Sequence, residues 1–214
     1  MRKTRILKRS FDVAIACLAL LMTAPIMLVI AVGIWMIMGT PIIFPQRRPG
    51  LHGIAFTMFK FRTMAQGPGS DEERITSLGA FLRRTSLDEL PELWNVVRGE
   101  MSLVGPRPLL MQYLHRYSKE QMRRHEVLPG ITGQAQVNGR NALSWEERLA
   151  IDVSYVDHHN LWLDLRIMLQ SVGSVLGRRG TSHQGHATMP EFMGTTTQPE
   201  ACVPTGVVVQ SQET

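Results

Sequence analysis

The sequence predicts an α+β protein that is mostly helical and begins with a membrane helix. Three observations carry this prediction: a long uncharged segment near the amino terminus, one pair of β-branched and aromatic stretches joined by turn residues, and apolar residues at helical spacing further on. The 214 residues suffice for one core and are too few for two comfortable ones. We therefore expect residues 1–40 in the membrane, 41–177 as a folded domain and 178–214 as a disordered tail.

Charge and cysteine content limit the kinds of partner and the kinds of site that the chain can have. The 23 Lys and Arg against 18 Asp and Glu give a net charge of +5, which favours an anionic partner such as phosphate, lipid headgroup or nucleic acid. The two cysteines, Cys17 in an apolar run and Cys202 in a polar stretch, exclude a disulfide framework and a thiolate metal site. No Walker loop, G-x-G-x-x-G or RNP-type aromatic motif accompanies the positive charge, so we expect no nucleic acid partner.

The uncharged segment covers residues 13–38, and its 26 residues exceed the roughly 20 needed to cross a bilayer. Basic residues flank it on both sides, in MRKTRILKR and PQRRPG, and short basic flanks stay on the cytoplasmic side. A helix that crosses the bilayer once cannot keep both basic flanks on the cytoplasmic side. Pro25 removes one hydrogen bond and should kink the helix. These observations leave two alternatives, a re-entrant helix that returns to the same face and a kinked spanning helix.

The elements that follow are predicted from local patterns. PIIFP and IAFTMFKFRTM, separated by the turn residues QRRPGLHG, predict a β-hairpin. Ser70 and Glu73 form a capping box before a helix that reaches about Arg84. Further helices are predicted over 89–97, 109–126, 145–156 and 162–176, the third behind a second capping box. The last helix either lies along the bilayer surface or faces the core.

The stretch RRTSLDELPEL places Asp88 beside Glu89. Acidic residues favour a first helical turn, so the pair can simply begin a helix. Asp88 suits the N-cap better than Ser86, because Pro91 then falls among groups that have no intrahelical partner. A carboxylate at such a helix start should be ionised at pH 7, with its pKa lowered further by nearby arginines. It would serve as a nucleophile or as a Mg²⁺ ligand, and attack on an anionic phosphate needs such a cation.

Basic residues surround this pair in the sequence. VGPRPLL holds Arg107 between two prolines, and PGITGQAQVNGRN ends near Arg140 in a glycine- and amide-rich stretch suited to binding phosphate. Taken singly, each also has an ordinary reading as a solvated arginine or a turn. Lys60 at the end of the hairpin and Arg83 before the carboxylates are further candidates, with snorkelling to lipid phosphates as the alternative.

Five motifs in this order resemble the small monotopic phosphoglycosyl transferases of the bacterial sugar transferase family: KRSFD, FKFRTM, RRTSLDELPEL, MSLVGPRPLL and PGITGQAQVNGRN. The resemblance covers residues 5–176. It implies transfer of a sugar-1-phosphate from a UDP-sugar to undecaprenyl phosphate, with Mg²⁺ and release of UMP, as the first membrane step of glycan assembly. It also implies a catalytic domain with interfacial helices on the cytoplasmic face of the bacterial inner membrane. AQVNGRN is more similar to the branch that handles N-acetylated sugars than to the glucose or galactose branch.

The resemblance also implies roles for residues. Asp88 would be the nucleophile that forms a covalent aspartyl phospho-sugar, and Glu89 would hold Mg²⁺ with it. The implied phosphate-binding residues are Arg83, Arg107, Arg140 and Lys60. The membrane helix would be re-entrant and broken at Pro25. Ala24 stands where many relatives have Ser, which removes a hydroxyl able to satisfy backbone groups at the break. Apolar helix faces offer a surface for a homodimer. The alternative function is a non-catalytic, membrane-tethered module that binds anionic lipid or nucleic acid.

Overall fold

The computed structural model of the chain describes residues 2–139, 143–176 and 191–194. Within these residues the chain forms mostly helices and two small two-stranded sheets, which confirms the predicted α+β, mostly helical fold. The predicted tail lies outside the described residues except for 191–194.

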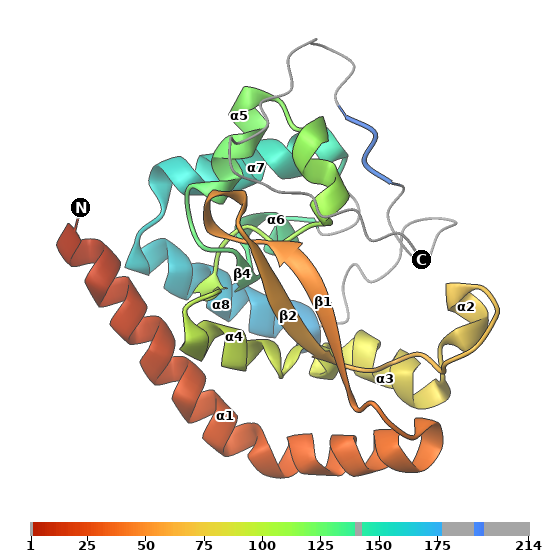
Figure 1. Cartoon of the computed structure of the whole chain (residues 1–214). Coiled ribbons are helices and arrows are strands. Elements are labelled where there is room, and N and C mark those ends of the chain that lie inside the picture. Colours follow the sequence, from red (N-terminus) through yellow and green to blue (C-terminus); the bar gives the residue numbers. More distant parts are fainter. Residues whose placement is uncertain (1, 140–142, 177–190, 195–214) are drawn as a thin grey trace.

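The amino-terminal helix α1 (Arg2–Met38) is continuous and contains Pro25. Its ribbon changes direction near the middle (Figure 1), as expected for a helix in which proline breaks one backbone hydrogen bond. Thr23 favours the same bend, because its hydroxyl donates to the carbonyl of Ala19 at 2.7 Å and such back-bonding bends helices. The bend turns the second arm beneath the rest of the molecule (Figure 1).

Both arms of α1 pack against the folded domain. Ala16, in the first arm, is fully buried in the main core cluster, and Ile30 and Ile34, in the second, are buried with Phe61 from the hairpin. Other large apolar side chains of the helix are exposed, among them Leu21, Met22, Val29 and Met36. The stretch Ile6–Met38 is long and apolar enough to cross a membrane by length and composition, and protein buries only 11% of its most apolar window.

The predicted hairpin is confirmed, since β1 (Ile43–Pro49) and β2 (Ala55–Phe61) pair antiparallel. β1 continues through the predicted turn residues QRRP, so the turn itself is shorter and contains the 3-10 element η1 (Leu51–Gly53). Arg62, directly after β2, donates to the carbonyl of Met38 at 2.5 Å and to the next two carbonyls at 2.8 and 3.0 Å. The hairpin therefore satisfies the carbonyls at the end of the membrane helix.

The helix predicted over 70–84 is two helices. α2 (Asp71–Arg74) begins with the predicted capping box and ends after one turn. Ile75 then forms an isolated antiparallel bridge, and α3 (Ser77–Thr85) begins behind a new N-cap, Thr76. The threonine side chain accepts a hydrogen bond from the backbone N–H of Gly79, the third residue of the new helix. This cap stabilises the start of a second helix rather than one continuous helix.

Asp88 is not an N-cap, so that prediction is wrong. Ser86 takes a left-handed conformation, with φ of 57°, and ends α3. The chain then enters a 3-10 turn, η2 (Leu87–Glu89), and α4 (Glu92–Arg98) begins only after Pro91. As the N-cap, Pro91 loses no intrahelical hydrogen bond, and the intervening turn is held by bonds between residues three apart.

The helix predicted over 109–126 is three short elements: η3 (Met111–Arg116), α5 (Lys119–Met122) and η4 (Arg123–His125). Ser118 begins α5 with a capping box of the form S-x-x-Q, in which both reciprocal hydrogen bonds are present. This local signal was overlooked, and it explains why the apolar spacing does not produce one helix.

Two three-residue strands, β3 (Ser102–Val104) and β4 (Gly130–Thr132), pair in parallel and were not predicted. Their approach requires glycine, because a Cβ at Gly130 would lie 2.1 Å from the backbone nitrogen of Gly105. The glycines of VGPRP and PGITG thus pack against each other. This contact fixes the start of the loop that carries Arg107.

Three helices complete the domain. α6 (Gln134–Val137) is a single turn, and α7 (Trp145–His158) begins with the predicted capping box at Ser144. α8 (Leu161–Leu176) confirms the helix predicted over 162–176.

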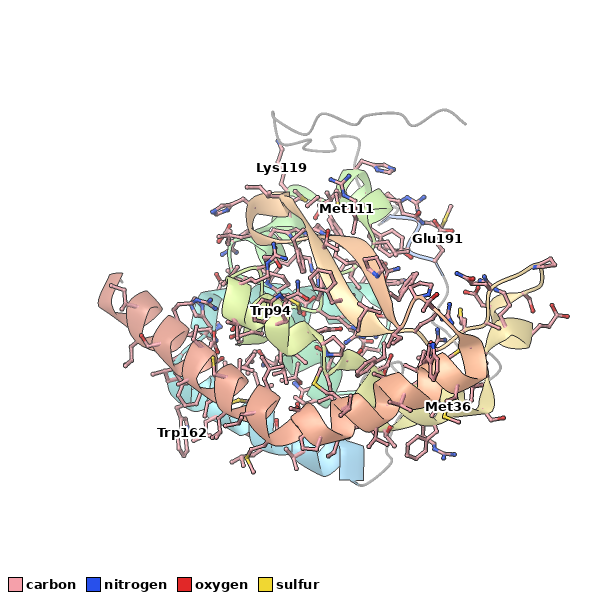
Figure 2. The ribbon with its side chains drawn as sticks, turned by 60° about the horizontal axis from the view of Figure 1, so that its bottom comes forward. Met36, Trp94, Met111, Lys119, Trp162 and Glu191 are labelled. Carbon is pink, nitrogen blue, oxygen red and sulfur yellow. The ribbon has the colours of Figure 1, made fainter. Side chains whose placement is uncertain are left out.

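Large apolar side chains are exposed along one edge of the molecule. Figure 2 shows Trp162, on α8, and Met36, on α1, along the same lower edge, with Met111 and Lys119 toward the opposite end. The two lower side chains are 76% and 74% exposed. An apolar edge shared by α1 and α8 is typical of a membrane-facing surface.

Candidate functional site

A cavity of about 780 Å³ lies between α1, η2, the loop after β3, α6 and α7. Ala19 and Thr23 line it from α1, so the cavity reaches the membrane helix. Five arginines and two carboxylates line it as well: Arg83, Arg84, Arg107, Arg124, Arg148, Glu89 and Asp152. The excess of positive charge favours an anionic ligand.

Glu89 joins two of the cations. Its Oε1 accepts hydrogen bonds from Lys60 Nζ at 2.8 Å and from Arg107 Nη2 at 2.5 Å. Lys60 comes from the end of β2 and Arg107 from the loop between two prolines, so tertiary packing brings them together. Burial alone would raise the pKa of Glu89, but the charges of Arg107 and Lys60 outweigh it and hold that pKa at about 2. Glu89 is therefore ionised at neutral pH.

A third carboxylate, Glu92, lies on the other side of Lys60. It is 1% exposed, and its Oε1 is 3.0 Å from Lys60 Nζ without hydrogen-bond geometry. Burial, followed by the negative charge of Glu89, raises the pKa of Glu92 to about 7. We call Asp88, Glu89, Glu92, Lys60 and Arg107 the carboxylate side of the cavity; Glu89 and Arg107 line it, and the other three lie around them.

Asp88 is 9% exposed and is not itself among the residues that line the cavity, whereas its chain neighbour Glu89 is. Burial and the charge of Glu89 raise the pKa of Asp88. Lys60, Arg107 and Arg83 act in the opposite direction, through charge alone and without a hydrogen bond. The expectation of a lowered pKa is therefore wrong, because loss of water around the carboxyl outweighs the nearby cations. Additional positive charge beside Asp88 would favour its ionised form.

Arg83 reaches the cavity from the last turn of α3. Its Nε donates to Thr63 Oγ1 at 2.9 Å, so the second residue after the hairpin orients its guanidinium group. Arg84 also lines the cavity, and its guanidinium carbon lies 6.0 Å from the centre of the Phe81 ring.

Arg124 and Arg148 also line the cavity, and we call them the arginine wall. Arg124, on η4, is 2% exposed and donates to Asp152 at 2.7 and 3.1 Å and to the carbonyl of Arg107 at 2.7 Å. Arg148, on α7, has a pKa lowered first by burial; the charge of Asp152 raises that pKa, and the charges of Arg107 and Arg124 lower it further. A bound anion would relieve this repulsion.

The structure brings three predicted residues, Lys60, Glu89 and Arg107, into direct contact and places Arg83 on the same cavity. Arg140 lies outside the described residues.

Four residues were missed: Glu92, Arg124, Arg148 and Asp152. Asp152 carried a usable signal, because it falls on the buried face of a predicted helix and a buried charge requires a partner. Its partner is 28 positions earlier, and no local pattern identifies it.

The carboxylate side also offers ligands for Mg²⁺. In the described parts of the chain, no three His, Cys, Asp or Glu side chains are grouped so that they could hold a metal ion. Two carboxylates suffice when substrate phosphates complete the shell, because Mg²⁺ binds through one or two carboxylates and keeps several waters. Asp88, whose carboxyl has no hydrogen-bonded cation, and the ionised Glu89 fit this requirement.

Taken together, an arginine-rich cavity, a cluster of carboxylates and direct access to an apolar helix define a protein that handles phosphate-bearing substrates at a membrane. Residues 3–178 match the Bacterial sugar transferase family, and the chain belongs to that family.

Three relatives illustrate the similarity. "Uncharacterized sugar transferase EpsL" of Bacillus subtilis (strain 168) is 49% identical over 195 residues, which cover 88% of this chain and 96% of the relative. The "UDP-glucose:undecaprenyl-phosphate glucose-1-phosphate transferase" of Xanthomonas campestris pv. campestris is 44% identical over 185 residues, 78% of this chain and 38% of the relative. The "Undecaprenyl-phosphate galactose phosphotransferase" of Salmonella typhimurium is 35% identical over 205 residues, 84% and 42%. The chain thus spans nearly all of the first relative and less than half of the other two.

Proposed function

We propose that this phosphoglycosyl transferase moves a sugar-1-phosphate from a UDP-sugar to undecaprenyl phosphate and releases UMP. The observation that carries the proposal is the carboxylate side, where Asp88 adjoins an ionised Glu89 held between Lys60 and Arg107. Relatives of the family are named for transfer of glucose-1-phosphate or phosphogalactose to the same lipid, which supports both substrates.

The reaction proceeds in two displacements at Asp88. An oxygen of its carboxylate attacks the phosphorus that bears the sugar, the bond from that phosphorus to the UMP oxygen breaks, and UMP leaves. A phosphate oxygen of undecaprenyl phosphate then attacks the same phosphorus and frees the Asp88 carboxylate. Two steps at one anionic group replace a direct encounter between two anionic substrates.

Arginine side chains and Mg²⁺ would each bind part of the substrate phosphates. Arg107 lies on the carboxylate side, where it can donate to a phosphate while it holds Glu89, and Arg83 approaches from α3. Mg²⁺ held by Asp88 and Glu89 would supply positive charge to the phosphates and favour the ionised form of Asp88. Arg140 is a further proposed phosphate ligand.

The bend of α1 supports a re-entrant, monotopic helix on the cytoplasmic face of the inner membrane. Ala16 before Pro25 and Ile34 after it are both fully buried against the same folded domain. A straight spanning helix would place its ends about 30 Å apart across the hydrocarbon layer, on opposite sides. Since Ala19 and Thr23 also line the cavity, a lipid-linked acceptor can reach the site from the bilayer.

Release of UMP tests the proposal. The full chain in detergent is incubated with undecaprenyl phosphate, Mg²⁺ and a panel of UDP-sugars that includes glucose, galactose and N-acetylated forms. We expect release with at least one donor, its loss on chelation of Mg²⁺, and a loss of at least about a thousandfold in Asp88→Asn. Asp71→Asn is the matched control, because that carboxylate is 72% exposed and far from the cavity lining.

The covalent step has its own readout. Without the lipid acceptor, the wild-type chain should release about one UMP per protein and retain the labelled phospho-sugar. Near-normal turnover in Asp88→Asn would refute the nucleophile. Absence of UMP release with every donor, together with lipid binding that falls steeply with added salt, would instead identify a non-catalytic module that binds anionic lipid.

A further inference from the structure

A short piece of the carboxyl-terminal region packs against the folded domain. Residues 191–194, the isolated blue segment in Figure 1, lie beyond residue 178, where the family match ends. Phe192 is 1% exposed, although nothing else in residues 178–214 is described except its immediate neighbours. We call Glu191 and Phe192 the tail anchor.

Phe192 is buried among three aromatic rings. Its centroid lies 5.6 Å from that of Tyr113, 5.5 Å from that of Tyr117 and 5.3 Å from that of Trp145. Such separations are those of favourable aromatic pairs, which stabilise beyond the burial of their surface. The three rings come from η3, the residue after it and α7, so one side chain joins separate elements.

Polar contacts also hold this segment in place. Arg116 donates to Glu191 Oε1 at 2.8 Å and to the carbonyl of Phe192 at 2.5 Å, and Gln112 donates to Glu191 Oε1 at 2.8 Å. Figure 2 shows Glu191 beside the body of the molecule, well away from the edge that carries Trp162. The anchor is therefore specific in both its apolar and its polar contacts.

Two of the rings that surround Phe192 also support the arginine wall. The guanidinium carbon of Arg148 lies 5.3 Å from the centre of the Trp145 ring, and that of Arg124 lies 5.8 Å from the centre of the Tyr117 ring. Both arginines line the cavity. Contacts of this kind fix a guanidinium group by cation–π attraction. Phe192 thus packs against the rings that hold both cations of the wall.

We propose that the tail anchor positions the arginine wall for the diphosphate of the nucleotide donor. This inference rests on the proposed function for the identity of the donor. Phe192 is a positioning residue: it acts through Trp145 and Tyr117 and touches no substrate. Loss of its ring removes one of the contacts that hold each of these two side chains, and Arg124 and Arg148 then bind the diphosphate less well.

The test compares full-length variants in detergent, at a temperature well below the melting temperature of each. Phe192→Ala should raise the Kd for UDP, measured by calorimetry, and the KM for the preferred UDP-sugar by roughly three- to tenfold, with kcat within about twofold. Met193→Ala is the matched control and should leave both constants unchanged, because this neighbouring side chain is 76% exposed and its sulfur is a distant acceptor, 3.9 Å from Arg116 Nη1. Glu191→Gln, a surface change that does not threaten folding, should raise the Kd about twofold.

The outcomes separate the two proposals. A lower melting temperature in Phe192→Ala with unchanged Kd and KM would show a purely structural role and overturn the positioning role. If the wild-type chain turns over and both anchor variants match Met193→Ala, the positioning role fails and the transferase stands. If no donor is turned over but Phe192→Ala still weakens UDP binding relative to Met193→Ala, the positioning role stands and the transferase proposal fails.

Discussion

The two sides of the cavity hold their charges differently. On the carboxylate side, Lys60 and Arg107 are both paired with Glu89, so that opposite charges lie within 2.8 Å of each other. On the arginine wall, Arg124 is paired with Asp152, and the charges around Arg148 are mixed, because Asp152 attracts it while Arg107 and Arg124 repel it. A paired arrangement changes little when a substrate arrives, and this favours chemistry that depends on fixed geometry. A wall with excess positive charge favours capture of an anion.

Among changes that compare the two sides, the largest effect is expected from Arg107→Met, which removes the shortest contact on the carboxylate side. Glu89 would keep only Lys60, its pKa would rise, and Asp88 would face a less ordered neighbour. We expect kcat for UMP release to fall by about 10²–10³, as for loss of one preorganised charge donor. Arg98→Met, which changes an arginine that pairs with Glu100 outside the cavity lining, should retain activity. A kcat within twofold of wild type in Arg107→Met would show that the pairing does not matter for chemistry.

Local patterns predicted the parts of the fold that depend on adjacent residues. The hairpin followed from turn residues between two β-rich stretches, and the capping boxes at Ser70 and Ser144 were correct. The third box, at Ser118, was equally visible and was overlooked. The strands β3 and β4 could not be predicted, since three residues carry no periodicity and their pairing depends on a contact between glycines 25 positions apart.

The candidate site was likewise predictable where a local motif carries the signal and not where distant contacts decide. The motifs identified Lys60, Glu89 and Arg107, which the fold brings into contact. They gave the wrong direction for the pKa of Asp88, because burial is a property of the tertiary structure and outweighs the charges that the sequence displays. Glu92 was not a candidate for the same reason, since only packing reveals that it is buried beside Lys60.

A smaller effect, on binding rather than chemistry, is expected from Arg148→Gln. This change removes one cation of the arginine wall and leaves the carboxylate side intact. The KM for the UDP-sugar should rise about tenfold, which corresponds to roughly 1.4 kcal/mol, with kcat nearly unchanged. Arg123→Gln is the control, because Arg123 bonds Glu120 and Asp157 on the outside of the same region. Equal losses of kcat and kcat/KM in Arg148→Gln would remove the distinction between a binding side and a chemical side.

The smallest effect concerns the pH dependence of stability and separates Glu92 from Glu89. The pKa of Glu92 is raised to about 7 in the folded chain, above an ordinary value of 4.5. Between these two values the folded state binds more protons than the unfolded state, so this group lowers the free energy of unfolding as pH rises from about 4.5 to 7. Glu89 has the opposite sign and a different window: its stabilisation is present above pH 4.5 and is lost as pH falls toward 2.

Glu92→Gln should therefore flatten the stability profile between pH 5 and 7.5 and leave the acid limb, which belongs to Glu89, in place. Relative to wild type, the free energy of unfolding of the variant should improve by about 2–3 kcal/mol across that window. Denaturant unfolding at a series of pH values measures it, and the contributions of the histidines cancel in the difference between the two chains. Parallel profiles would mean that Glu92 is ionised throughout and that Lys60 neutralises two carboxylates at once. The carboxylate side would then carry one more negative charge at neutral pH, and its contrast with the arginine wall would be larger than the structure indicates.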